Sequence, residues 1–217
     1  IKKDFNLKKK ILTHYNLSEL NFQKFLKPRN KKFTIVYSGN FGKAQDFKTL
    51  FQTLHNSEIK KNFNFRLIGA GKKFNDIRKY VIKSKLNNSV KIQKYMSEKN
   101  LYKILLNSDA LFLTLNKGDA LNNTIPGKFQ TYLPFGKPLI SNSIGAVNDI
   151  IRKTNIGYTN SPGDNRTLLQ NLFKIKKMTL YEKKNIYKRS YLLYLKYFEL
   201  QKNINNLNTI FKKCINN

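Results

Sequence analysis

Two glycine turns and a lysine in this 217-residue chain have the types and spacing that suit phosphate chemistry. The first turn is Gly39-Asn40-Phe41-Gly42, followed directly by Lys43, and the second is Gly69-Ala70-Gly71. Glycine lets backbone N–H groups approach a phosphate closely, and a following helix N-terminus adds partial positive charge. Ala44 stands where a phosphate loop needs Ser or Thr, and Phe74 stands where the dinucleotide fingerprint has its third glycine. Each turn alone therefore fits a packing turn as well as a ligand site.

Lys128 is a further candidate, because its expected place in a helix is unfavourable without a ligand. Thr124 can cap a helix that begins near Pro126, which places Lys128 in the first turn. A lysine at this positive end of the helix dipole costs stability unless an anion lies opposite, so the misfit is a functional hint. Lys137 lies beyond the end of the same helix, and we expect it to affect neither ligand affinity nor stability.

A repeating strand–turn–helix pattern must position these residues. Apolar, β-branched runs predict strands at residues 33–38, 63–68, 90–92, 110–115, 138–141 and 156–159. Apolar residues at helical spacing follow most of them. This alternation predicts an α/β fold, a Rossmann-like three-layer αβα domain with a parallel sheet. Ligands bind such sheets outside the carboxyl ends of the strands, where both glycine turns fall. The segment from residue 168 onward predicts amphipathic helices that pack on the domain.

The charge of the chain is strongly positive, with 42 basic and 12 acidic residues and a net charge of +30. Residues 1–32 and 171–217 are about twice as charge-dense as the segment between them. Such a field attracts the phosphates of nucleic acid or of an anionic membrane. Compositional drift explains the positive charge equally well. Asparagine and isoleucine are abundant too, and their codons, like those of lysine, are A/T-rich. The charge comes without an RNA-binding signature or an aromatic stacking platform, so we do not expect nucleic acid as a partner.

Several classes of protein are disfavoured by what the sequence lacks. Cys214 is the only cysteine, which argues against a disulfide or a cysteine-based metal site and fits a reducing cytoplasm. No apolar run approaches the roughly 18 residues of a membrane-spanning helix. The start of the chain carries no apolar core of a signal peptide. We therefore expect a cytoplasmic protein.

Four segments occur in a distinctive order and spacing: residues 38–45 around the first glycine turn, 68–71 at the second, 108–112 and 124–138. Together they resemble the C-terminal, donor-binding domain of glycosyltransferase family 4 enzymes of the GT-B fold. The similarity is greatest to the branch that builds bacterial surface polysaccharides, which includes the fucosamine transferases, and it covers about residues 30–200. It implies three parts: a linker or acceptor-domain remnant at 1–32, a nucleotide-sugar-binding domain at 33–175 and C-terminal helices at 176–217.

The resemblance implies retaining transfer from a nucleoside-diphosphate sugar, with neither a metal nor a cofactor. No Asp-x-Asp pair occurs in the sequence, which agrees with metal independence. Lys43 and Lys128 would face the diphosphate and stabilise the leaving group. Tyr95 and Met96 would border the base. The other implied donor-binding residues are Gly39, Asn40, Phe41, Gly42, Gly69, Gly71, Asn123, Thr124, Ile125 and Thr131.

The sequence departs from this family at two places. Many members carry two glutamates separated by seven residues, and the corresponding positions here are Asn123 and Thr131. A glycine-glutamate pair that is usual in the branch reads Gly145-Ala146. The acceptor domain is absent from these residues, so its equivalent is an expected partner, as is an anionic membrane surface at the inner face of the plasma membrane. Two alternatives stay open: a non-catalytic remnant or partner-dependent subunit that binds sugar nucleotide, and a basic nucleic-acid-binding protein.

Overall fold

The computed structural model describes Ser18, residues 25–28 and residues 30–215. Within them one parallel sheet of six strands forms the centre of the molecule. Its strands are β1 (Phe33–Ser38), β2 (Phe63–Ile68), β3 (Val90–Gln93), β4 (Ala110–Thr114), β5 (Leu139–Asn142) and β6 (Gly157–Asn160). The strand order across the sheet is β3-β2-β1-β4-β5-β6. The order reverses between β1 and β4, and ligands bind open α/β sheets at such a point.

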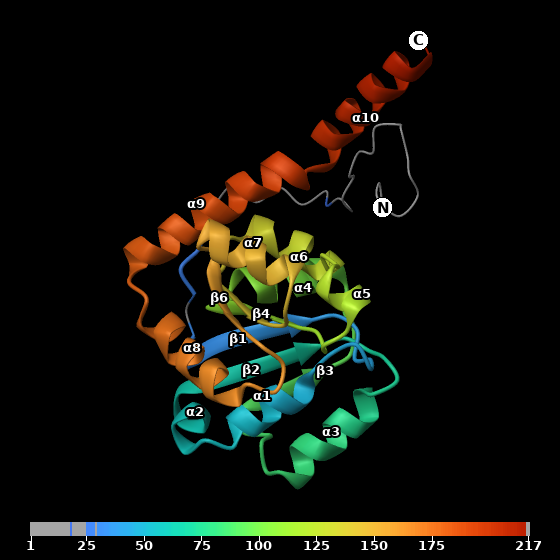
Figure 1. Cartoon of the computed structure of the whole chain (residues 1–217). Helices are drawn as coiled ribbons and strands as arrows, with labels where there is room; N and C mark the ends of the chain where they lie inside the picture. Colours follow the sequence, from blue (N-terminus) through green and yellow to red (C-terminus); the bar gives the residue numbers. More distant parts are fainter. Residues whose placement is uncertain (1–17, 19–24, 29, 216–217) are drawn as a thin grey trace.

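Helices cover both faces of this sheet (Figure 1). One face carries α1 (Phe47–Leu54), α2 (Ser57–Asn62), α3 (Phe74–Lys83) and α8 (Asn165–Lys177). The other carries α4 (Glu98–Leu106), α5 (Asp119–Asn122), α6 (Gly127–Tyr132), the 3-10 helix η1 (Leu133–Phe135) and α7 (Ala146–Thr154). The chain ends in α9 (Leu180–Tyr197), which packs against η1, and α10 (Leu200–Ile215), which extends away from the sheet (Figure 1). This arrangement confirms the predicted Rossmann-like, three-layer α/β fold.

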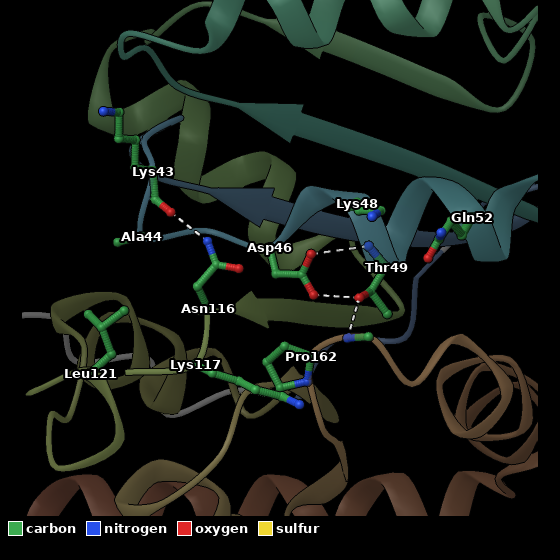
Figure 2. A pocket seen from close by; sticks show the side chains of 11 residues that line it. Lys43, Ala44, Asp46, Lys48, Thr49, Gln52, Asn116, Lys117, Leu121 and Pro162 are labelled. Carbon is green, nitrogen blue, oxygen red and sulfur yellow. Dashed lines mark hydrogen bonds between the residues drawn. The ribbon is translucent and has the colours of Figure 1, made fainter. Parts of the chain in front are cut away.

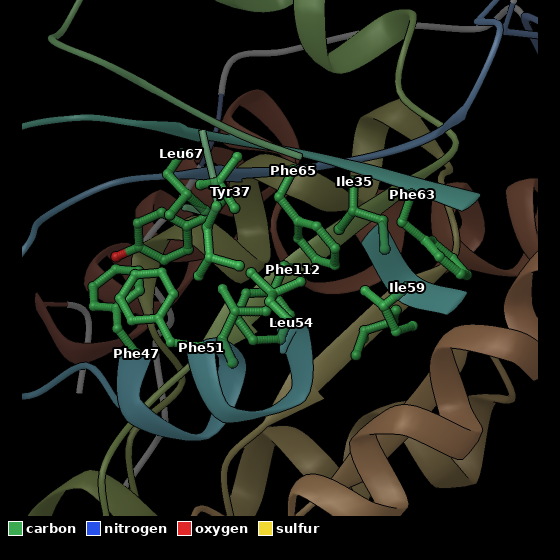
Figure 3. Packing of buried hydrophobic residues seen from close by; sticks show 14 of the residues in the cluster. Ile35, Tyr37, Phe47, Phe51, Leu54, Ile59, Phe63, Phe65, Leu67 and Phe112 are labelled. Atoms are coloured by element: carbon green, nitrogen blue, oxygen red, sulfur yellow. The ribbon is translucent and has the colours of Figure 1, made fainter. Parts of the chain in front are cut away.

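Each face of the sheet has its own hydrophobic core, because the central strands are buried on both sides. Every residue of β1 and β4 is buried, as expected for parallel strands between two helical layers. In Figure 3, Phe47, Phe51 and Leu54 of α1 face the side chains of β1 and β2. The second core joins the opposite face to α6, α7 and α9. Burying a large apolar side chain contributes about 1.5–3 kcal/mol, so these two clusters hold the strand ends in place.

The observed elements differ from the expected ones in detail. The expected strands are present, and β5 and β6 each begin one residue later than predicted. The helix expected from Pro126 begins at Gly127 and continues into η1. Thr124 does not cap it, since its hydroxyl donates to the Ala120 carbonyl instead, 2.6 Å away. The boundary expected at residue 175 falls inside α8, and most of the expected linker at 1–32 lies outside the described residues.

Candidate functional site

The two glycine turns lie against each other at the carboxyl ends of β1 and β2. Gly39 N–H donates to the Ile68 carbonyl at 2.9 Å, and Phe41 N–H donates to the Ala70 carbonyl at 2.8 Å. A Cβ atom at Gly69, where φ is +152°, would lie only 1.8 Å from the Gly39 carbonyl oxygen. Glycine is therefore required here first of all by the close approach of two backbones.

Phe41 and Gly71 take structural roles in this pair of turns. The Phe41 ring is fully buried and stacks on Phe47 with the ring centroids 5.2 Å apart. Its side chain thus belongs to the core, and its assignment as a donor-binding residue stays a prediction. A Cβ at Gly71 would lie 2.3 Å from the Asn40 side-chain oxygen, so Gly71 serves the same packing. Gly42 N–H is bound by the Gln45 side chain at 2.9 Å.

Lys128 lies directly beside the first glycine turn, brought there by the start of α6. Its ammonium group donates to the Tyr37 hydroxyl at 2.9 Å and lies 4.4 Å from the centre of the Tyr37 ring. A Cβ at Gly39 would lie 2.9 Å from the Lys128 Cε atom. The Tyr37 hydroxyl in turn donates to the Asn40 carbonyl at 2.5 Å. The strand end, the turn and the helix start thus meet at this lysine.

The electrostatics of Lys128 suit the binding of an anion. Desolvation by burial lowers the pKa of Lys128 to about 8. No acidic side chain among the described residues forms an ion pair with it, and its described side-chain partner is the neutral Tyr37 hydroxyl. Burial raises the pKa of Tyr37, with smaller contributions in the same direction from Tyr132 and Tyr95. Tyr37 therefore stays neutral, and the lysine charge is only weakly compensated.

Tyr37 and Tyr132 are the site residues that sequence reasoning missed. The Ser38 N–H donates to the Tyr132 hydroxyl at 2.7 Å, which fixes the end of β1 to α6. Tyr37 interrupts an aliphatic strand directly before a glycine turn, and a buried tyrosine hydroxyl needs a polar partner. That combination is the signal by which Tyr37 could have been found. Tyr95, predicted near the base, is 58% exposed, and its assignment stays a prediction.

Of the remaining predicted donor residues, Met96 lies between β3 and α4, and the others lie between α5 and α6 or within α6. Ile125 and Met96 are half-buried against the second core. Asn123 and Thr131 direct their side chains to their own helical backbone, toward the Asp119 carbonyl at 3.1 Å and the Gly127 carbonyl at 3.2 Å. To donate a hydrogen bond to a ribose or a sugar, either side chain would have to break its bond to the helix backbone or form a bifurcated one.

Lys43 does not share the surroundings of Lys128. It is exposed, its carbonyl accepts a hydrogen bond from the Asn116 side chain at 2.5 Å, and its ammonium group points away from the other labelled residues in Figure 2. The joint contact of both lysines with one diphosphate stays a prediction. Lys43 borders a cavity of about 810 Å³ between α1, the β4–α5 connection and Gly163.

Lys137 differs from its prediction. It is only 4% exposed, and its ammonium group donates to the Leu26 carbonyl at 2.8 Å. It therefore belongs to the packed interior and is unsuitable as an inert control. In the part of the chain that the structure describes, no cluster of three or more His, Cys, Asp or Glu side chains could hold a metal ion, and no helix is long and apolar enough to cross a membrane.

Comparisons with known proteins agree with this geometry. The family model of glycosyl transferases group 1 matches residues 18–189, whereas no curated protein matches the chain. The pneumococcal O-GlcNAc transferase GtfA in complex with UDP and GlcNAc is 11% identical with a TM-score of 0.74, covering 100% of this chain and 43% of that one. A glycosyltransferase from Rickettsia africae is 18% identical with a TM-score of 0.72, and the match covers 87% of this chain and 49% of that one. Anabaena HepE in complex with UDP and glucose is 11% identical with a TM-score of 0.69, covering 83% and 48%. At these identities the likeness shows the fold, and the chain spans about half the length of these proteins.

Proposed function

Since this chain belongs to the glycosyl transferases group 1 family, we propose that it is the donor-binding half of a glycosyltransferase. It binds a nucleoside-diphosphate sugar at the carboxyl edge of the sheet, between the turn at Gly39 and the start of α6. Lys128 carries this proposal, because it is a desolvated cation beside a glycine turn with no acidic partner among the described residues. A bound diphosphate supplies the missing negative charge.

The reaction that we propose is transfer of a hexosyl or related glycosyl group with retention, without a metal or cofactor. The bond between the anomeric carbon and the diphosphate oxygen breaks, and the acceptor oxygen bonds to the anomeric carbon. The proton of the acceptor hydroxyl passes to the nucleoside diphosphate as it leaves. Negative charge grows on the leaving diphosphate as that bond breaks. Lys128 stabilises this charge from its position on Tyr37, and the exposed Lys43 adds a second cation from the other side of the turn.

The ligands of similar folds support a uridine nucleotide as the first donor to test. The HepE and GtfA structures contain UDP, together with glucose and GlcNAc respectively. We propose a role in the synthesis of a bacterial surface polysaccharide, in the cytoplasm. Because the chain spans about half the length of these proteins, transfer requires an acceptor domain or an equivalent partner chain.

A second candidate function is a subunit that binds sugar nucleotide without transferring sugar. Asn123 and Thr131 favour it, because these positions carry no carboxylate and their side chains bond their own helices. The two functions differ in one measurement. When the chain is combined with the partner half, the transferase releases nucleoside diphosphate from the donor, and the binding subunit does not.

The C-terminal helix supports attachment to an anionic membrane. Along α10, Leu200, Ile204, Leu207 and Phe211 recur at helical spacing, and Ile204 and Phe211 are 37% and 59% exposed. Residues 200–217 contain no acidic residue. A basic helix with an apolar face binds at a lipid surface, with about 1 kcal/mol from each apposed lysine. Equal sedimentation with anionic and neutral vesicles at moderate salt contradicts this attachment.

Calorimetry with UDP, GDP and dTDP tests the donor proposal directly. We expect at least one of them to bind the chain with a dissociation constant in the micromolar range, and Lys128→Ala to weaken that binding. Absence of binding at millimolar concentration by all three nucleotides contradicts the proposed function. A subsequent screen of UDP-sugars identifies the sugar.

A further inference from the structure

The cavity of about 810 Å³ beside α1 is distinct from the surroundings of Lys128 (Figure 2). It opens at the same edge of the sheet, but Tyr37, Gly39 and Lys128 do not line it. Its walls come from three segments that are far apart in the sequence: residues 43–52, residues 116–121 and the turn at 162–163. Its volume falls in the range of about 300–1,000 Å³ that small-molecule sites occupy.

Buried hydrogen bonds fix the three walls relative to one another. Asp46 caps α1 by accepting from the Thr49 N–H at 3.2 Å, and its carboxylate also accepts from the Asn142 side chain at 3.1 Å. The Thr114 hydroxyl donates to the Asp46 carbonyl at 2.9 Å, and the Gly163 N–H donates to the Thr49 hydroxyl at 2.6 Å. Buried hydrogen bonds therefore fix the backbone around the cavity, whereas the side chains of Lys48, Gln52 and Lys117 that line it are exposed.

The charge of the lining is positive and largely uncompensated. Lys43, Lys48 and Lys117 contribute three cations, and none forms an ion pair with a described acidic residue. Asp46 is the single acidic residue in the lining, and both of its carboxylate oxygens are already bound by Thr49 and Asn142. Lys48 is the second residue of α1, where a lysine opposes the helix dipole.

Two carboxamides add hydrogen-bonding capacity to the same cavity. The Gln52 side chain makes no hydrogen bond to a described residue, and Asn116 uses only its amide nitrogen, on the Lys43 and Gln45 carbonyls. Gln52 can therefore donate to and accept from hydroxyl groups, whereas Asn116 has its side-chain oxygen left as an acceptor. In Figure 2, Lys117 extends toward Pro162, whereas the Lys43 ammonium group points away from the cavity. The cations that can act within it are therefore Lys48 and Lys117.

We propose that this cavity is a second ligand site, which binds a phosphorylated sugar independently of the donor nucleotide. Lys48 and Lys117 hold the phosphate, and the carboxamides of Gln52 and Asn116 hold the sugar hydroxyls. The cavity is larger than a phosphate ion requires, and both chemistries are present in its lining. We assign this ligand to the acceptor of the transfer, and that assignment rests on the proposed function. The binding of a sugar phosphate in the cavity does not rest on it.

Calorimetry with glucose 1-phosphate tests the site on the full chain at about 150 mM salt, where the general field of the protein is screened. The variant is Lys48→Ala/Lys117→Ala. Its matched control is Lys79→Ala/Lys83→Ala, which removes the same charge from exposed positions of α3. We expect millimolar or tighter binding by the unmodified chain, at least about fivefold weaker binding by the variant, and a change of less than about twofold in the control. Normal melting temperature and UDP affinity show that the variant is folded.

Three results overturn the proposal: no binding of glucose 1-phosphate up to about 10 mM, equal weakening in the variant and in the control, or loss of sugar-phosphate binding when UDP is saturating. The last result means that the cavity belongs to the donor site. The two proposals fail separately. If UDP does not bind but glucose 1-phosphate does, the donor function falls and this site stands; the reverse outcome removes only this site.

Discussion

Two lysines only nine residues apart, Lys128 and Lys137, both have a lowered pKa, but they lie in different surroundings. Desolvation by burial lowers the pKa of each to about 8. Lys137 lies inside the packed domain and donates to the Leu26 backbone carbonyl at 2.8 Å. For Lys137, Asp109 opposes the lowering of its pKa and Lys183 adds to it. Lys128 lies at the carboxyl edge of the sheet and donates to a neutral tyrosine hydroxyl.

The difference teaches that a lowered lysine pKa does not by itself mark a ligand site. Lys137 already has a fixed acceptor, and its chain fills space between the segment at residue 26 and the sheet. Lys128 has no acidic partner among the described residues, and it lies against the glycine turn at Gly39. Position relative to the strand ends and the nature of the partner separate the two roles.

Lys137→Ala should produce the largest change in stability. The substitution removes a buried side chain and leaves the Leu26 carbonyl without its donor, so we expect a loss of about 2 kcal/mol. The melting temperature should fall by roughly 4–8 °C for a chain of this size, with UDP affinity unchanged. Lys137→Met keeps the apolar length of the side chain and should lose less. Normal stability of the alanine variant contradicts a structural role for Lys137.

Lys128→Ala should weaken ligand binding without loss of stability, which is the reverse of the effect expected for Lys137→Ala. We expect UDP binding to weaken by about tenfold, which corresponds to about 1.4 kcal/mol. The melting temperature without ligand should stay the same or rise slightly, because a lysine in the first turn opposes the helix dipole. Calorimetry and thermal unfolding of the same samples check both halves. A variant that is clearly destabilised and binds UDP normally shows that Lys128 is structural.

The affinity for UDP should depend on pH through Lys128. A bound diphosphate favours the charged lysine and raises its pKa above the value of about 8 in the free protein. Binding therefore takes up protons near pH 8, and affinity should fall by up to about tenfold between pH 7 and pH 9. Calorimetry in two buffers with different heats of ionisation measures the uptake. The uptake should be absent from Lys128→Ala and present in Lys137→Ala.

The two lysines also make the stability of the ligand-free chain depend on pH. Each lysine has a folded pKa near 8, below its ordinary value of 10.5. Between these values the unfolded chain binds more protons, so both lysines make stability rise with pH across this window. Urea unfolding at pH 7.5 and pH 9.5 should show a smaller rise in either alanine variant than in the unmodified chain. An identical rise in all three proteins shows that neither lysine titrates in this window.

The sequence by itself determined the order of the strands and helices, the two glycine turns and the place of Lys128 near a helix start. These features depend on neighbours along the chain: β-branched runs, helical spacing and turn residues act within a few positions. The resemblance to a glycosyltransferase donor domain also followed from such local segments, and the match of the family model to residues 18–189 confirmed it at the level of the family.

Only the tertiary structure decided which side chains share a site. It placed Tyr37 beneath Lys128, turned the Phe41 ring into the core, buried Lys137 and brought residues 43–52, 116–121 and 162–163 around one cavity. Most of these contacts join segments tens of residues apart, so a local sequence pattern does not specify them. Whether a lysine is exposed, paired or desolvated depends on what packs against it, and that packing is a property of the whole sheet and its two helical layers.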